Sequence, residues 1–159
     1  MQLLIHVLIV FFTFLMMEFV AWFTHKYIMH GLLWILHKDH HVGKEGFFER
    51  NDAFFLIFAI PGASLSIFGA LAHYDYKFFI GLGITLYGLA YFFVHDIFIH
   101  QRFKLFRNAK HPYFSAIRRA HKMHHKHVGK DEGECFGMLL VPYKYFKGAK
   151  KASNNLFEK

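Results

Sequence analysis

The chain has 159 residues, which is the size of one domain, but its composition differs from that of ordinary soluble proteins. Hydrophobic residues make up 55% of it and aromatic residues 20%, with three prolines and a formal net charge of +8. Its single cysteine excludes an internal disulfide and any cysteine-based zinc or iron–sulfur site within one chain. The composition favours a membrane protein in which histidine carries any metal chemistry.

Three apolar runs, at residues 3–23, 53–72 and 78–94, are each predicted to form a membrane-spanning helix. At 1.5 Å per residue these helices would cover roughly 25–32 Å, which matches the thickness of a bilayer core. No Lys or Arg precedes the first run, and its length exceeds that of a signal peptide, so we expect it in the mature protein. The sequence therefore predicts an all-α integral membrane protein with a single domain over residues 1–159.

Basic residues set the expected orientation of the three spans. Of the 19 Lys and Arg residues, Lys77 alone lies outside residues 24–52 and 95–159. The positive-inside rule then places those two segments in the cytoplasm and the N-terminus outside, as expected for a multi-pass membrane protein. We attribute the positive charge to orientation and to contact with anionic lipid rather than with nucleic acid, because no nucleic-acid-binding module is recognisable.

Ten of the 14 histidines follow one arrangement that occurs twice, a His-x4-His pair followed by a His-x2-His-His triplet. Neutral imidazole is the commonest metal ligand in proteins, and ten such residues exceed the three or four that hold one zinc ion. We therefore predict a centre for two metal ions in the cytoplasmic segments 24–52 and 95–142. The predicted ligands are His25, His30, His37, His40, His41, His95, His100, His121, His124 and His125.

The spacing of these histidines predicts how their side chains are presented. On an α-helix, positions i, i+3 and i+4 fall within about 100° of one another, so each triplet is expected to deliver its nitrogens into one small volume. Positions i and i+5 differ by about 140°, so each x4 pair requires helix curvature, a π-bulge or a site approached from the side. The remaining histidines, His6, His73, His111 and His127, are interpreted as interfacial, loop or solvated residues.

Three acidic residues are candidates for holding the ligand imidazoles in place. Glu18 lies within an apolar span, where an unpartnered acid is costly, and it precedes His25 by nearly two helical turns. It could accept the proton of that imidazole and fix its tautomer, or occupy a polar packing contact. Asp39 and Asp96 adjoin motif histidines and have the same alternatives of imidazole partner or exposed cap. The pair at residues 51–52 could be a helix cap or part of the site.

The segments around these histidines resemble the bacterial β-carotene 3-hydroxylases, carotenoid hydroxylases of the fatty acid hydroxylase and sterol desaturase superfamily. The resemblance covers residues 15 to 142, and the order of x4 and x2HH boxes separates this group from desaturases. Larger members of the superfamily have four membrane helices, whereas three are predicted here. The segments that carry the resemblance are Met17-Glu18, residues 25–31, residues 48–52, residues 91–96, His100-Gln101-Arg102, residues 120–125 and the cluster Gly133, Cys135, Phe136 and Gly137.

The resemblance implies a non-haem diiron monooxygenase in which the ten repeated histidines bind two iron ions. With O2 as co-substrate, such an enzyme adds a hydroxyl at carbon 3 of β-ionone rings and converts β-carotene to β-cryptoxanthin and zeaxanthin. It further implies a carotenoid substrate reaching the site from the bilayer, and electrons from a ferredoxin-type donor. The basic residues that could dock such a donor are Arg102, Lys104, Arg107, Lys110, Arg118, Arg119 and Lys122.

Alternative functions remain open at the level of sequence. Another oxygenase of the same superfamily would hydroxylate a fatty-acyl chain or a sterol. A non-catalytic metal transporter would place its ligands near the membrane midplane, whereas these histidines lie at or beyond the inner ends of the spans. A haem cytochrome would leave most of them unexplained. An all-imidazole site also accepts zinc, copper or nickel, so iron depends on the resemblance and on the redox demand, and purified protein could carry zinc.

Overall fold

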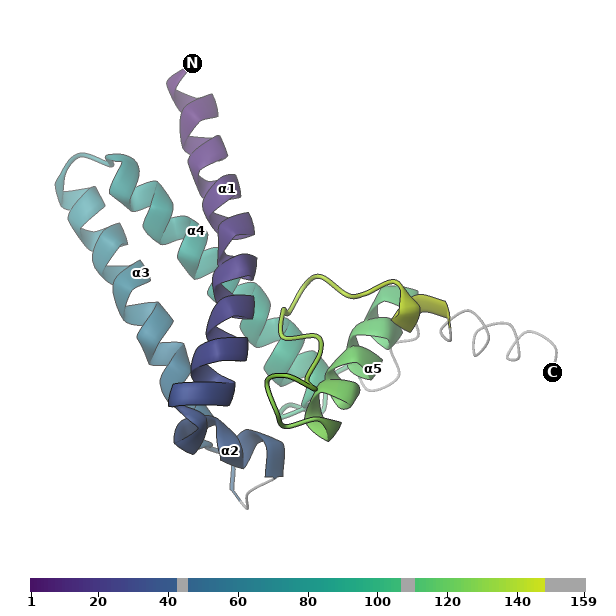
Figure 1. Cartoon of the computed structure of the whole chain (residues 1–159). Coiled ribbons are helices and arrows are strands. Elements are labelled where there is room, and N and C mark those ends of the chain that lie inside the picture. The colour runs from purple at the N-terminus through teal and green to yellow at the C-terminus, as the bar shows by residue number, and fades with distance from the viewer. Residues whose placement is uncertain (43–45, 107–110, 148–159) are drawn as a thin grey trace.

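The computed structural model describes residues 1–42, 46–106 and 111–147, and all regular secondary structure in this part of the chain is helical (Figure 1). This confirms the predicted all-α class. The elements in chain order are α1 (Gln2–Phe23), the π-helix η1 (Thr24–Leu32), α2 (Trp34–Val42), the 3-10 helix η2 (Arg50–Asp52), α3 (Ala53–Leu71), α4 (Tyr76–Tyr91), the π-helix η3 (Phe92–Ile99) and α5 (Pro112–Lys126).

Three continuous helical runs, Gln2–Leu32, Arg50–Leu71 and Tyr76–Ile99, are long and apolar enough to cross a membrane. They match the three predicted spans, except that the second ends one residue before its predicted end and the first continues well beyond its own. Most of their large apolar side chains face outward; Leu3 and Leu71, for example, are 76% and 74% exposed. Such a surface suits a hydrocarbon surrounding, because it would be unfavourable against water.

Helix α4 packs against both α1 and α3, and small residues allow the close approach (Figure 1). A Cβ atom added at Gly83 would lie 2.7 Å from the Cβ atom of Thr13 on α1, and one added at Gly62 would lie 3.0 Å from Ile84 of α4. Close backbone contact is the usual way in which membrane helices gain packing energy, since lipid provides little hydrophobic driving force between them.

The two π-helices lie at the two x4 histidine pairs: η1 contains His25 and His30, and η3 contains His95 and ends at its cap residue His100. In a π-helix each N–H bonds to the carbonyl five residues earlier, and the His100 N–H accordingly donates to the His95 carbonyl at 2.8 Å. This local geometry brings residues five apart onto one face, which is the π-helical solution that the spacing allowed. At Gly31 the backbone leaves helical geometry, with φ −124° and ψ −105°, and the chain turns into α2.

The remaining elements gather at one end of the three long helices, where α2 and α5 lie near the ends of η1 and η3 (Figure 1). A small apolar core joins η3, α5 and the segment that follows α5; its buried members are Val94, Phe98, Ile117 and Met138. Ala116 and Ala120 of α5 pack on Tyr145 beside it. This core fixes α5, and with it the second histidine triplet, against the end of the third long helix.

Candidate metal centre

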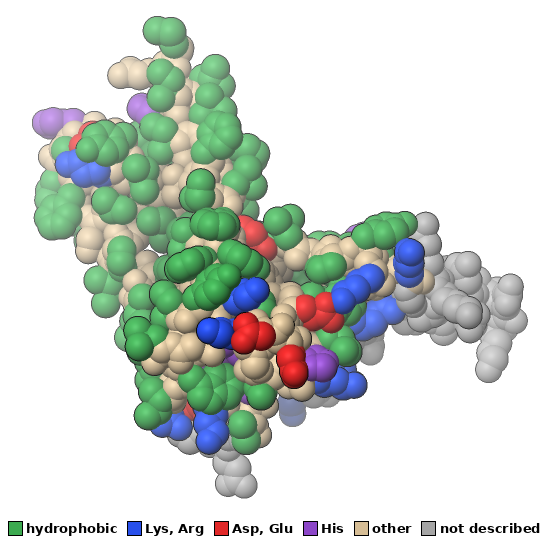
Figure 2. Space-filling model, in the orientation of Figure 1, with side chains coloured by type: hydrophobic (Ala, Val, Ile, Leu, Met, Phe, Trp, Pro, Cys, Tyr) green, Lys and Arg blue, Asp and Glu red, His purple; other side chains and the backbone are tan. Residues whose placement is uncertain are grey.

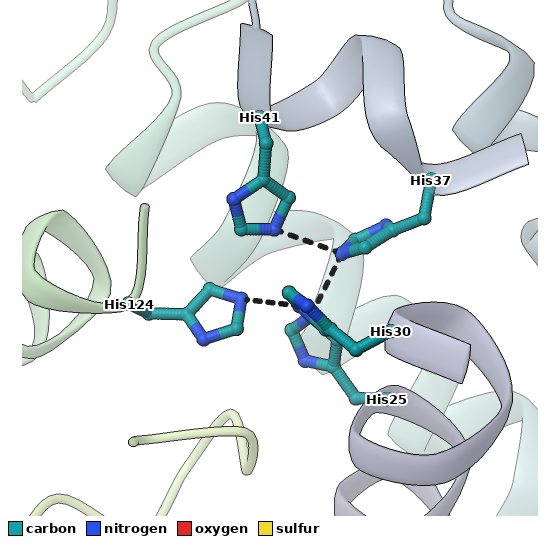
Figure 3. A group of neighbouring side chains, drawn as sticks. All are labelled: His25, His30, His37, His41 and His124. Carbon is teal, nitrogen blue, oxygen red and sulfur yellow. Dashed lines mark hydrogen bonds between the residues drawn. The ribbon is translucent and has the colours of Figure 1, made fainter. Parts of the chain in front are cut away.

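Nine of the ten repeated histidines fall into two compact groups, and the tenth adjoins one of them. The first cluster consists of His25, His30, His37, His41 and His124, and the second of His40, His95, His100 and His121. Within each cluster the candidate ligand atoms all lie within 4.8 Å of one another. The Nε2 atom of His125 lies 2.8 Å from that of His121, which adds His125 to the edge of the second cluster. Figure 3 shows the first cluster, whose imidazoles converge from η1, α2 and α5.

Each triplet is divided between the two clusters, contrary to the expectation that it would serve one small volume. His37 and His41 join the first cluster while His40 joins the second. In the second triplet, His124 joins the first cluster while His121 and the adjoining His125 belong to the second. The physical reason is that positions i+3 and i+4 lie about 100° apart around a helix. The imidazoles of these adjacent residues therefore point to different sides of the helix face that carries the triplet. The clusters adjoin, since the rings of His41 and His125 stack with centroids 4.4 Å apart. They form one centre with two parts.

All ten imidazoles turn Nε2 inward. Every one of these Nε2 atoms lies 2.8–3.2 Å from the Nε2 atom of another histidine in the set. The pair His30 and His124 shows why this arrangement suits a cation. Their Nδ1 atoms lie 2.8 and 3.1 Å from the carbonyl oxygens of Val128 and Glu134, which can only accept, so each Nδ1 carries the proton. In the neutral rings, both facing Nε2 atoms then present lone pairs, which repel unless a metal ion lies between them.

The protonation of the ligand set fits the same conclusion. Burial lowers the pKa of His37 and of His124 to about 3. Burial, together with repulsion from neighbouring imidazoles, lowers the pKa of His41 to about 2 and that of His125 to about 4. These rings are therefore neutral at physiological pH, which is the form that binds metal. The residues present thus fit two metal ions with imidazole ligands.

The three acidic residues predicted beside the ligands have different outcomes. Asp96 does contact a ligand, with Oδ2 3.2 Å from Nδ1 of His95. Glu18 does not hold His25, whose Nδ1 donates instead to the Phe136 carbonyl at 2.9 Å. The Glu18 carboxylate instead accepts hydrogen bonds from the backbone N–H groups of residues 138–140 and from the Tyr87 hydroxyl, because the loop after α5 folds over it. Asp39 is also not an imidazole partner, since its carboxylate accepts from the Arg50 N–H at 2.8 Å.

Two further side chains hold ligand imidazoles. Asn51, which the sequence left open as cap or site residue, accepts from His37 Nδ1 at 2.7 Å. Glu49 was not predicted as a site residue, and its carboxylate lies 2.8 Å from His40 Nδ1. It also forms a capping box with Asp52 at the start of η2. The acidic residues just before the second span could have identified Glu49 from the sequence, because a carboxylate beside a ligand histidine commonly fixes the tautomer of that histidine.

The other four histidines lie away from both clusters. His6 stacks on Phe79 with ring centroids 3.9 Å apart, and His73 lies exposed in the turn between α3 and α4. His111 caps α5 by accepting the N–H of Tyr113. His127 follows the last turn of α5, and its N–H bonds to the His124 carbonyl. Their separation from the clusters agrees with their interpretation as residues outside the metal set.

A cavity of about 290 Å³ extends from the long helices to the metal centre, and its lining is mostly apolar. It is lined by residues of α1, α3 and α4, and its polar end includes His25 of the first cluster and His95 of the second. Tyr91 lines it and stacks on His95 with ring centroids 4.8 Å apart. Of the aromatic residues at this end of α4 and the start of η3, Tyr87 and Phe92 also line the cavity. The cavity therefore places an apolar space beside one imidazole of each cluster.

Comparisons with known proteins agree with this arrangement. The model of the fatty acid hydroxylase family matches residues 10–146. The chain is 41% identical to the β-carotene hydroxylase of Pantoea ananas, over 85% of this chain and 77% of that protein. It is 40% identical to β-carotene hydroxylase 1 of Capsicum annuum and to β-carotene 3-hydroxylase 2 of Arabidopsis thaliana, over 79% of this chain in both cases. It spans only 40% and 42% of those chloroplast proteins. No solved structure gives a significant match.

Proposed function

The chain belongs to the fatty acid hydroxylase family, and from this premise we propose that it is a β-carotene 3-hydroxylase. The observation that carries the proposal is the apolar cavity, which leads from the long helices to one histidine of each cluster. A carotene is as apolar as a bilayer core, so a site that acts on it needs an entrance within the membrane layer. The names of the bacterial and plant relatives supply the substrate class.

The reaction inserts one oxygen atom of O2 at carbon 3 of a β-ionone ring, and the other oxygen leaves as water with two electrons and two protons from a donor. Two iron ions, held by the two histidine clusters, would supply the redox chemistry that an unactivated C–H bond requires. The apolar cavity lining binds the ring and excludes water. The outward Nδ1 partners, such as Asn51 and Glu49, hold the ligand imidazoles in one tautomer and orientation.

The proposed orientation has the histidine clusters in the cytoplasm and the N-terminus outside, in the inner membrane of a bacterium. It rests on the distribution of Lys and Arg, of which only Lys77 lies at the opposite ends of the spans. Figure 2 shows Lys and Arg side chains concentrated over the end of the molecule that carries α2 and α5. Over the long helices the same view shows mainly apolar side chains and backbone.

The proposed electron donor is a ferredoxin-type protein that docks on this basic surface. The contacts of the predicted basic residues support a smaller docking set than the sequence suggested. Arg102 is turned inward and bonds to Asp52 at 2.7 Å, so it is not a docking residue. Arg118 donates to the carbonyls of Phe98 and Phe106, and Arg107 and Lys110 lie outside the described residues. The exposed members of the predicted set include Lys104 and Lys122.

Expression in bacterial cells that accumulate β-carotene tests the proposal, with iron and a ferredoxin system supplied. We expect β-cryptoxanthin and zeaxanthin in pigment extracts separated by liquid chromatography, and neither product in cells that carry the empty vector. A membrane-inserted protein that yields no hydroxylated carotenoid would overturn the substrate assignment. Hydroxylated fatty-acyl chains or sterols in the same cells would then identify the alternative oxygenase, and metal uptake into vesicles without O2 consumption would identify a transporter.

A further inference from the structure

The outward-facing nitrogens of the two clusters have chemically different partners. In the first cluster, every Nδ1 atom with a hydrogen-bond partner among the described residues bonds to a neutral oxygen. Three of these acceptors are backbone carbonyls of the segment after α5, and the fourth is the Asn51 side chain. The pairs are His25 with Phe136 at 2.9 Å, His30 with Val128 at 2.8 Å, His124 with Glu134 at 3.1 Å and His37 with Asn51 at 2.7 Å.

In the second cluster, the two Nδ1 atoms that have a hydrogen-bond partner among the described residues both face carboxylates. Nδ1 of His40 lies 2.8 Å from Glu49, and Nδ1 of His95 lies 3.2 Å from Asp96. Arg102 links these two acids, at 3.2 Å from Glu49 and 3.1 Å from Asp96. It also bonds to the carboxylate at position 52, so that three carboxylates surround one guanidinium beside this cluster. The side chains of Glu49, Asp96 and Arg102 are only 21%, 12% and 15% exposed, so water screens their charges weakly.

This difference affects how strongly each cluster attracts a divalent cation. A carboxylate that accepts the Nδ1 proton makes the imidazole more basic, and the excess negative charge beside the second cluster adds a direct attraction. A backbone carbonyl fixes the tautomer without contributing a net charge. The charges beside the second cluster therefore favour cation binding there.

The first cluster depends in addition on one carboxylate inside the first long helix. Oε1 of Glu18 accepts three backbone N–H groups of the segment after α5, from Met138 at 2.9 Å, Leu139 at 2.8 Å and Leu140 at 2.9 Å. Oε2 accepts the Tyr87 hydroxyl at 2.7 Å. The segment fixed in this way is the one whose carbonyls orient three imidazoles of the first cluster. Glu18 is thus a positioning residue that acts on His25, His30 and His124 through the loop, not by touching them.

We propose that the two clusters bind metal ions with different affinities and under the control of different residues. The second cluster, supported by Glu49, Asp96 and Arg102, fills first. The first cluster fills second, and only while Glu18 holds residues 128–140 against α1. This inference rests on the metal-binding part of the proposed function and goes beyond it, because it names the order of filling and the residues that set each affinity.

Titration of the full-length apo-protein in detergent with Co²⁺ tests the proposal, with binding followed by cobalt absorption and confirmed by Zn²⁺ competition against a chelator. The wild type should bind two ions in two steps that differ in affinity. Changing a partner of a metal ligand typically lowers affinity about 10- to 100-fold. Glu18→Gln and Glu18→Ala should weaken only the second step by this amount, with the larger effect for Ala. Asp96→Asn should weaken only the first step by the same factor.

Glu132→Gln, at an exposed position of the same loop, is the matched control and should leave both steps unchanged. Circular dichroism and size-exclusion profiles identify any variant that fails to fold, and Glu18→Gln, which keeps the side-chain shape, guards against that result for Glu18→Ala. Equal weakening of both steps by Glu18→Gln and Asp96→Asn, or two equivalent steps in the wild type, would overturn the proposal while leaving the proposed function intact. A wild type that binds no ion at all would overturn both.

Discussion

The two copies of the histidine pattern have the same spacing but different surroundings. In the first copy, a kink at Gly31 separates the x4 pair on η1 from the triplet on α2, and the chain is helical on both sides of it. In the second, a long connection lies between η3 and α5, and α5 is held by the apolar core around Ile117. Neither copy completes a cluster, because each gives its i+3 histidine to the other. The repeated spacing sets the ligand geometry, whereas the unrepeated sequence around it sets the charge of the environment.

The largest expected loss of activity comes from removing the histidine that each copy of the pattern contributes to the other copy's cluster. His40→Ala should deprive the second cluster of its ligand from α2, and His124→Ala should deprive the first cluster of its ligand from α5. Each variant should insert into the membrane, retain one metal ion instead of two, and lose carotene hydroxylation by more than about 100-fold, since even indirect changes to metal ligands cost 10- to 100-fold. Metal analysis of purified protein and pigment chromatography are the measurements.

His73→Ala is the control for these substitutions, because His73 lies exposed in the turn between α3 and α4. It should keep two metal ions and full turnover. If His40→Ala retained full hydroxylation, the exchange of ligands between the two copies would have no functional meaning, and His40 would not be a ligand.

Much of this arrangement could be predicted from the sequence, because periodicity and charge are local properties. The three apolar runs predicted the long helices, and a spacing of five residues allowed the π-helical geometry seen at His25 and His30. The division of each triplet between clusters could not be predicted, since it depends on where α2 and α5 lie relative to each other. The carbonyl partners at Val128 and Phe136 leave no side-chain signature at all.

Glu18 shows where spacing alone misleads. An acid in an apolar span predicted a polar partner, and Glu18 has several. Its position nearly two turns before His25 suggested that imidazole as the partner, but the carboxylate bonds to backbone N–H groups and to Tyr87 instead. Its backbone N–H partners are more than a hundred residues away in the chain and Tyr87 is 69 residues away, so only the folded structure brings them together. The same limit applies to Arg102, whose basic character predicted a surface role, while three carboxylates from two segments draw it inward.

The cavity is the feature that the two clusters share, and blocking it should lower substrate turnover without changing the metal content of either cluster. Ala59 lines the cavity on α3, so Ala59→Phe should obstruct the ring of the substrate and lower carotene turnover by about 10- to 100-fold through misplacement of the reacting carbon. Metal content should remain at two ions. Ile60→Phe, on the same helix but 62% exposed toward the membrane layer, is the matched control and should retain activity. Loss of metal in Ala59→Phe would contradict the separation of cavity and clusters.

A smaller effect should come from a single methyl group that disturbs only the first cluster. A Cβ atom at Gly137 would lie 2.8 Å from Oε1 of Glu18, which cannot move away without losing its backbone N–H partners. Since Phe136, the acceptor for His25, is the adjacent residue, Gly137→Ala should lower metal affinity at the first cluster about tenfold, or about 1.4 kcal/mol, and leave the second cluster unchanged. Gly129→Ala lies in the same loop, where a Cβ atom meets nothing within 4 Å, and should change neither affinity. If Gly137→Ala weakened the second cluster as well, the two halves of the centre would share their supports, and the contrast between neutral and charged surroundings would not govern metal binding.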